Sequence, residues 1–431
     1  MILFTIMLVL VVLPLIGLSI DGGVAYVAQA RLSSAVDAAA LAGARSLNVG
    51  QDPSSQAANA QAIAAKYFDA NFPPGILNST NTTVTADPPK VSSYHTITMH
   101  VQASSDVQLY FLGLLGHPTA HLSAEGITSR RDVNVILALD RSGSMAGVCE
   151  VMKADAENFV DRFVDGRDRV GLITFMGTAS VDYAATRSFK SQNPSLNDTI
   201  AQLRCANNTG SAAALSLAHQ EILAAAEPGA LNIVVFFTDG VPNGFTAGPA
   251  TPGADPGFPL KSGKTCNGNS YARAYISNGG GMYDIAPQPI SSVANPQLKN
   301  CPNGSLSALA QSYQFIPEVD FWADSSSGYT GLTRDASGNI IFSSANSNAV
   351  SINAADNAAL KIRNDGIVIY AIGLGSNGGV DSAFLRRVAN DPTSTQYDSK
   401  QPTGKYYYAP NAGQLGAAFQ SIASEILRIS Q

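Results

Sequence analysis

Short apolar runs alternate with helical patterns over most of the chain, and this alternation constrains the fold more than any other feature. The runs span Val133 to Leu139, Arg169 to Phe175, Ile233 to Thr238 and Ile367 to Gly373. Each is too short for a buried helix but has the length of a buried strand. Helical patterns lie between or after them, at Cys149 to Val164, Ser211 to Ala225, Ile352 to Asn364 and Ala412 to Ile429. The alternation predicts an α/β fold, a doubly wound and mostly parallel sheet with helices on both faces.

The composition limits the number of domains and the kinds of partner. At roughly 150 residues per domain, the 431 residues of the chain predict two or three domains. Only 13% of the residues are charged, and the net charge is -6. An acidic chain lacks the basic surface that a phosphate backbone requires, so we expect no nucleic-acid partner.

Changes in composition divide the chain into three parts, which are residues 1–20, residues 21–131 and the predicted α/β domain at 132–431. Within the last part, residues 241–350 are rich in Gly, Pro, Ser and Asn. A stretch of this length far exceeds an ordinary connection between strands and helices. We therefore predict a long insertion at about 241–350.

The first part, residues 1–20, carries no ionisable side chain. As a helix it would be about 30 Å long, which matches the hydrocarbon core of a bilayer. A cleaved signal peptide is the alternative, but the apolar run is longer than usual for one, and no small-x-small cleavage site follows it directly. We predict a retained transmembrane helix.

The second part predicts a small α+β module. Ala-rich residues recur at helical spacing after Asp21, and residues 51–71 also have a helical pattern. From Thr83 onward the pattern is that of strands around a Pro88-Pro89 turn. We therefore expect a helical stalk followed by a small sheet.

Oxygen-bearing side chains gather at predicted strand ends and before a helix. The first strand of the α/β domain ends in Asp140-Arg141-Ser142-Gly143-Ser144, a later strand leads to Asp239, and Thr209 precedes a helix. Ligands of open parallel sheets bind at the carboxyl ends of the strands, so we expect these groups to converge. Two carboxylates and three hydroxyls suit Mg²⁺ or Ca²⁺ better than zinc or copper. Octahedral Mg²⁺ would keep a position for water or for an external carboxylate.

This pattern, DRSGS after a strand with a downstream Thr and TDG after another strand, resembles the von Willebrand factor A domain. The resemblance implies a metal-ion-dependent adhesion site that holds Mg²⁺, Ca²⁺ or Mn²⁺. Ser142, Ser144 and Thr209 would contact the metal through hydroxyl oxygens, and Asp140 and Asp239 would act directly or through water. It also implies a protein partner that presents Asp or Glu to the metal.

The front of the chain carries a second resemblance. An apolar helix leading into DGGVAYVAQARLSSAVDAAALAGA is similar to TadG-like and TadE-like proteins of bacterial Tad (Flp-type) pilus systems, although the basic residues that precede the helix in that family are missing. The resemblance implies a single-pass protein of the bacterial inner membrane with a pseudopilin-like module and other pilus assembly components as partners.

The orientation of the body has evidence on both sides. Arg31 and Arg45 follow the apolar run and no basic residue precedes it, which favours a cytoplasmic body. Paired cysteines favour an exported one. We expect the body in the periplasm or outside the cell.

Four cysteines without CxxC spacing argue against a zinc ribbon and favour two disulfides. Cys149 follows the DRSGS loop and Cys205 precedes Thr209, so their thiols would meet if both loops meet at the metal. We predict the pairs Cys149–Cys205 and Cys266–Cys301. Four unpaired buried thiols are the alternative.

Three functions fit these predictions. The first is adhesion, in which the metal engages a partner carboxylate. The second is a structural scaffold of a pilus or secretion apparatus, whose metal only stabilises the fold. The third, a metal-dependent hydrolase, is the weakest, because His219 lies within a predicted helix and neither a G-x-S-x-G motif nor a pair of catalytic carboxylates is present. We therefore predict a binding protein and not an enzyme.

Overall fold

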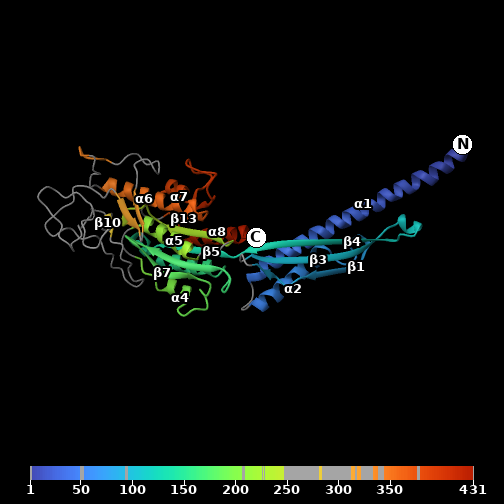
Figure 1. The fold of residues 1–431 in the computed structure, drawn as a ribbon, viewed down its shortest axis with the longest axis horizontal. Coiled ribbons are helices and arrows are strands. Elements are labelled where there is room, and N and C mark those ends of the chain that lie inside the picture. The colour runs from blue at the N-terminus through green and yellow to red at the C-terminus, as the bar shows by residue number, and fades with distance from the viewer. Residues whose placement is uncertain are drawn as a thin grey trace. The chain divides into compact units, whose positions relative to one another are not determined.

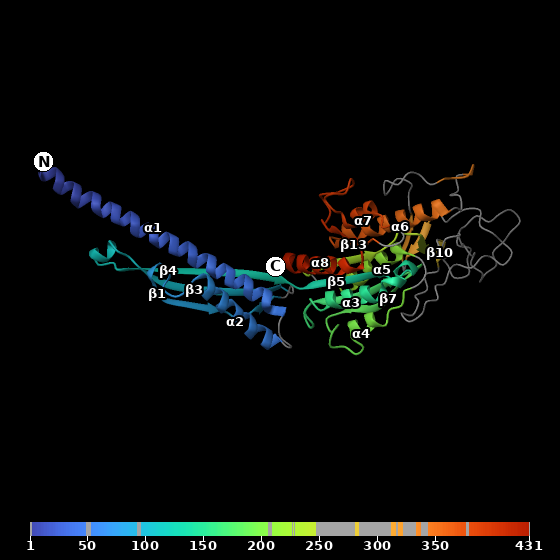
Figure 2. The same cartoon turned by 180° about the vertical axis from the view of Figure 1, so that it is seen from behind.

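The computed structural model divides into two compact units (Figures 1 and 2). Unit 1 comprises Met1–Asp132 with Pro228–Ala230 and Ser430–Gln431, and unit 2 comprises Val133–Glu227 and Leu231–Ile429. The structure describes residues 2–48, 53–92, 96–205, 209–225, 227, 229–246, 281–283, 312–315, 318–321, 333–337, 344–375 and 379–430.

Unit 1 packs two helices against one face of a four-stranded antiparallel sheet. The helices are α1 (Ile2–Arg45) and α2 (Pro53–Asn71), with the short 3-10 turns η1 (Ser46–Asn48), η2 (Ile76–Asn78) and η3 (Leu112–Leu115). The strands are β1 (Ser79–Ala86), β2 (Lys90–Val91), β3 (Thr96–Gln108) and β4 (Thr119–Arg131). The central strand β3 pairs with β4 on one side and with β1 and β2 on the other.

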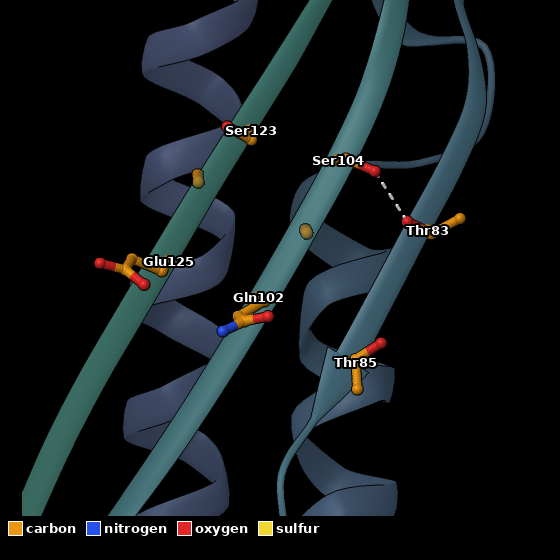
Figure 3. Close-up of a pocket in the computed structure, with 8 residues that line it drawn as sticks. Thr83, Thr85, Gln102, Ser104, Ser123 and Glu125 are labelled. Carbon is orange, nitrogen blue, oxygen red and sulfur yellow. Dashed lines mark hydrogen bonds between the residues drawn. The ribbon is translucent and has the colours of Figure 1, made fainter.

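The two faces of this sheet differ in polarity because side chains alternate along each strand. Ile97, Met99 and Val101 of β3 are buried in a core that α1 and α2 complete. The opposite face carries polar side chains, among which Thr83 and Ser104 form a 2.9 Å hydrogen bond (Figure 3). Among the residues that the structure describes, no helix combines the length and the apolarity needed to span a membrane.

Unit 2 is built on a six-stranded sheet in the order β14-β13-β8-β5-β6-β7. Its strands are β5 (Val133–Asp140), β6 (Arg169–Phe175), β7 (Ala179–Thr186), β8 (Leu231–Thr238), β13 (Val368–Leu374) and β14 (Lys405–Ala409). Every neighbouring pair in this sheet is parallel except the edge pair β6 and β7. All eight residues of β5 are buried, as expected for a central strand covered on both faces.

Helices cover both faces of the sheet, which confirms the predicted doubly wound α/β fold. One core cluster joins the sheet to α5 (Ser211–Ala225), α6 (Ser344–Asn364) and α7 (Ser382–Ala389). The other joins it to α3 (Cys149–Val160), α4 (Leu196–Ala201) and α8 (Leu415–Ile429). Two short 3-10 turns are η4 (Gly143–Gly147) and η5 (Ala412–Gln414).

The predicted insertion at 241–350 is described only in part. It contains β9 (Gly244–Thr246), which pairs with β10 (Gly281–Tyr283), and β11 (Ser312–Phe315), which pairs with β12 (Glu318–Phe321). Helix α6 begins at Ser344, before the predicted end of the insertion. The predicted pair Cys266–Cys301 lies outside the described residues.

Candidate functional site

The site residues lie at the carboxyl ends of two neighbouring strands of unit 2. Asp140 is the last residue of β5, and Asp239 directly follows β8. The two strands are parallel and hydrogen-bonded along their length, so both acids come to the same edge of the sheet. Thr209 lies two residues before α5 begins at Ser211.

The carboxylate of Asp140 is fully buried and accepts two hydrogen bonds from its surroundings. The backbone N–H of Ser142 donates to its Oδ1 at 2.8 Å, and the hydroxyl of Thr238 donates to its Oδ2. The first bond folds the DRSGS loop back over the strand end. The second links β5 to β8 immediately before Asp239.

The two serines connect Asp140 to Asp239. The Oγ atoms of Ser142 and Ser144 are 3.1 Å apart, and the hydroxyl of Ser144 donates to Oδ1 of Asp239 at 2.7 Å. Four of the five predicted site residues are therefore joined by one chain of hydrogen bonds.

Thr209 is held at the same edge by Asn243. The side-chain oxygen of Asn243 accepts the N–H of Thr209 at 2.9 Å, and the carbonyl of Thr209 accepts the N–H groups of Asn243 and Gly244 at 3.1 and 3.0 Å. The Thr209 hydroxyl lies 3.7 Å from the point where a Cβ on Gly240 would sit, next to Asp239. The structure thus brings all five predicted residues to one place. Asn243 was not predicted from the sequence, although an Asn four residues after Asp239 is a typical turn residue.

The acids of the site are electrostatically coupled. Burial raises the pKa of Asp140, the nearby Asp239 carboxylate raises it further, and the hydrogen bonds from Thr238 and Ser142 lower it, with a net pKa of about 7. Two acidic side chains this close together in a buried position favour a cation between them.

The donor set fits a hard divalent ion. Among the described residues, no group of three or more His, Cys, Asp or Glu is placed to hold a metal. A metal at this edge would therefore depend on hydroxyl oxygens in addition to the two carboxylates. All of these donors are oxygens, which Mg²⁺ and Ca²⁺ prefer and for which soft metals have little preference.

A buried arginine supports the loop from inside. The Arg141 side chain is only 1% exposed, and its Nε donates to the hydroxyl of Thr174 at 2.8 Å. That hydroxyl donates in turn to Asp182, which also accepts from Ser180 at 2.9 Å. Burial lowers the pKa of Arg141, and the charge of Asp182 opposes this shift. This role of Arg141 was not predicted from the sequence, in which an arginine in a loop usually faces solvent.

A disulfide and a close backbone approach at a glycine hold the neighbouring segments. The structure has a disulfide between Cys149 and Cys205, the pair expected from the sequence, with the Cα atoms 6.1 Å apart. It connects the start of α3, just after the DRSGS loop, to the segment that leads to Thr209. At Gly210 a Cβ would lie 2.5 Å from the carbonyl oxygen of Gly177, so only glycine allows this approach of the two loops.

Residues 135–241 match the von Willebrand factor type A domain family, and this range includes all five site residues. This part of the chain is similar to von Willebrand factor type A domains. Residues 1–46 match the Flp pilus-assembly TadE/G-like family. Both matches agree with the resemblances seen in the sequence. No curated protein matches the chain.

Several solved structures are similar to the chain. The pilus adhesin SpaC from Lactobacillus rhamnosus GG, in its open conformation, has 13% identity and a TM-score of 0.40 over 81% of this chain and 34% of SpaC. The von Willebrand factor domain of the type V pili tip protein Mfa5 from Porphyromonas gingivalis has 18% identity and a TM-score of 0.40 over 70% of this chain and 97% of that domain. The chain spans about a third of the length of SpaC.

Proposed function

We propose that the chain is a membrane-anchored, metal-dependent adhesion protein of a bacterial Tad/Flp pilus assembly system. The observation that carries the proposal is the hydrogen-bonded chain from Asp140 through Ser142 and Ser144 to Asp239, with Thr209 beside it. The expected ion is Mg²⁺, with Ca²⁺ or Mn²⁺ as alternatives.

The chemistry of the site supports binding of an external anion. A divalent ion balanced by only two carboxylates stays attractive to a third one, such as an Asp or Glu of a partner protein. Ser142, Ser144 and Thr209 would hold the ion through hydroxyl oxygens without adding negative charge. The disulfide and the buried Arg141 keep the loops that carry these hydroxyls in position.

The location follows from the first residues of the chain. Residues 1–46 match a pilus-assembly family, and residues 1–20 carry no ionisable side chain. We infer a single-pass anchor in the bacterial inner membrane with the A domain on the periplasmic or outer side. The disulfide supports this side because the cytosol keeps thiols reduced. Other components of the pilus assembly are the expected partners.

A binding function is favoured over hydrolysis by the environment of His219. Its Nε2 lies 2.6 Å from the Asp365 carboxylate, and the side chain is buried on α5. The histidine therefore has a structural partner of its own, and it is not among the groups that line the site.

The test compares capture of purified pilin subunits of the same system by the full chain in Mg²⁺ and in EDTA. We expect capture in Mg²⁺, loss in EDTA, recovery when Mg²⁺ is restored, and no capture by Asp140→Ala. Asp69→Ala, which removes an exposed acid of α2, is the matched control and should capture normally. Capture that persists in EDTA, together with a Mg²⁺-dependent rise in melting temperature, would instead support the scaffold function.

A further inference from the structure

The connection between β3 and β4 exposes an unusual set of apolar side chains. We call residues 109–118, which include η3, the hairpin tip. The exposed fractions of Tyr110, Phe111 and Leu114 are 58%, 39% and 85%. From Val107 to Pro118 the chain carries no Asp, Glu, Lys or Arg. A hairpin loop in water normally carries polar and charged residues. The composition of this tip instead favours contact with an apolar environment.

The hairpin tip is fastened to one level of α1. Both carboxylate oxygens of Asp21 accept backbone N–H groups of the tip, from Tyr110 at 2.9 Å, Phe111 at 2.8 Å and Leu112 at 2.7 Å. The Phe111 ring rests against α1 at Gly17, where a Cβ would lie 2.4 Å from its Cγ. Figures 1 and 2 show the β3–β4 connection beside α1 on the side towards its N-terminus.

The contacts at Gly17 and Asp21 lie at the C-terminal end of the uncharged segment of residues 1–20. The neighbouring α1 side chains are also apolar and exposed, with exposed fractions of 58% for Leu15, 51% for Leu18 and 45% for Ile20. The hairpin tip and these α1 residues therefore expose apolar side chains within two turns of Asp21 along α1.

We propose that the hairpin tip inserts into the interfacial layer of the phospholipid bilayer that holds the N-terminal helix. This inference rests on the membrane anchoring given under Proposed function. Tyr110 and Phe111 are aromatic residues of the kind that accumulate at the membrane–water interface, and Leu114 at the far end of the tip reaches the acyl chains. The tip then acts as a second, shallow anchor that fixes the tilt and rotation of α1.

The hydrogen bonds to Asp21 allow its charged carboxylate to lie at the membrane surface. Burial raises the pKa of Asp21, but the hydrogen bonds from Leu112, Tyr110 and Phe111 lower it more, so the net pKa is below the usual value for Asp. The carboxylate is fully enclosed and obtains its hydrogen bonds from peptide groups in place of water. It can therefore lie at the level of the headgroups, and it fastens the tip there.

The test measures the depth of single tryptophans in the full chain, reconstituted in phosphatidylethanolamine and phosphatidylglycerol vesicles with or without phosphatidylcholine brominated on its acyl chains. Trp322, the only tryptophan of the chain, is first replaced by Phe. Leu114→Trp reports on the tip and Leu18→Trp on the anchor. Val91→Trp is the matched control, because Val91 is 67% exposed and pairs with Ile97, at the end of β3 away from the tip.

We expect brominated lipid to quench Leu114→Trp and Leu18→Trp, with blue-shifted emission, and to leave Val91→Trp unquenched. If Leu18→Trp is quenched while Leu114→Trp emits as in water, the tip does not enter the bilayer and the inference is wrong although the anchor stands. If neither Leu18→Trp nor Leu114→Trp is quenched, the anchoring itself fails and the inference fails with it. Quenching of all three positions would show nonspecific adsorption and would also overturn it.

Discussion

The hydroxyl of Ser144 donates a 2.7 Å hydrogen bond to the carboxylate of Asp239, which lies 95 residues further along the chain. The two residues follow neighbouring parallel strands, β5 and β8. This bond holds the DRSGS loop and the end of β8 within reach of one ion. We therefore expect ion binding at this site to need little rearrangement of the loop.

Asp239→Asn should separate metal binding from stability. One of the two carboxylates is lost, so we expect the affinity for Mg²⁺ to fall more than tenfold, about 1.4 kcal/mol or more. Because the like charge beside Asp140 is also removed, the free energy of unfolding in EDTA should stay the same or rise. Calorimetric titration and denaturant unfolding measure the two quantities, and Asp69→Asn is the control. A clear loss of stability in EDTA would contradict the proposed repulsion.

The stability of the metal-free protein should fall as the pH rises. The pKa of Asp140 is about 7 in the folded protein and 3.8 without the fold, so the folded state binds the proton more tightly. Its contribution is fully present below about pH 4, declines through the acidic range, and is lost above about pH 7, a change on the order of a few kcal/mol. The affinity for Mg²⁺ should increase over the same range, because the proton must leave first.

Denaturant unfolding at a series of pH values, in EDTA and in saturating Mg²⁺, tests this dependence. Asp239→Asn should weaken it, since the neighbouring charge is one of its two causes. A metal-free stability that rises from about pH 4 to about pH 7 would refute the assignment to Asp140.

Removal of the disulfide should reduce both stability and metal affinity. Cys149 and Cys205 are 56 residues apart, and the chain-entropy model gives about 4 kcal/mol for a loop of this length. The double variant Cys149→Ser with Cys205→Ser should lose stability of this order in denaturant unfolding. Its Mg²⁺ affinity should also fall, because the segment before Thr209 is no longer tied to the start of α3. Unchanged affinity would mean that the disulfide stabilises the fold alone.

Arg141 and Asp182 should be coupled in a double-mutant cycle. Arg141→Met removes the positive charge near the Asp182 carboxylate, which keeps its hydrogen bonds from Thr174 and Ser180, so we expect the free energy of unfolding to fall by about 1–3 kcal/mol. Asp182→Asn in the same background removes the uncompensated charge and should recover a large part of the loss. Additive effects of the two substitutions on the free energy of unfolding would show that the residues are not coupled.

Gly210→Ala should move Thr209 away from the site. The added Cβ would lie 2.5 Å from the carbonyl oxygen of Gly177, so the loop before α5 must shift. We expect at least a tenfold loss of Mg²⁺ affinity, about 1.4 kcal/mol. Gly147→Ala is the control, since no atom lies within 4 Å of its added Cβ. Equal titration curves for the two variants would argue against a metal-binding role for Thr209.

The sequence by itself determined the central strands and the identity of the site residues. The run Val133 to Leu139 is apolar at every position except Asn134. Such a run is typical of a strand that is buried on both faces, and all residues of β5 are buried. The acid or hydroxyl that ends such a run must lie at the sheet edge, so Asp140 and Asp239 were placed by a purely local pattern. The edge strands β7 and β14 were not predicted, because their mixed exposure breaks this pattern.

The tertiary structure alone decided which groups support the site. The residues next to Arg141 in the sequence do not determine whether its side chain faces solvent or the interior. In the structure it points inward, where Thr174 on β6 accepts its hydrogen bond and the charge of Asp182 on β7 is near. Asn243 holds Thr209 across 34 residues, and Asp21 holds the hairpin tip across about 90. Such pairs form only after the fold has brought distant segments together. A hydrogen bond depends on the donor–acceptor distance and on the angle at the hydrogen, and neither is set by sequence spacing.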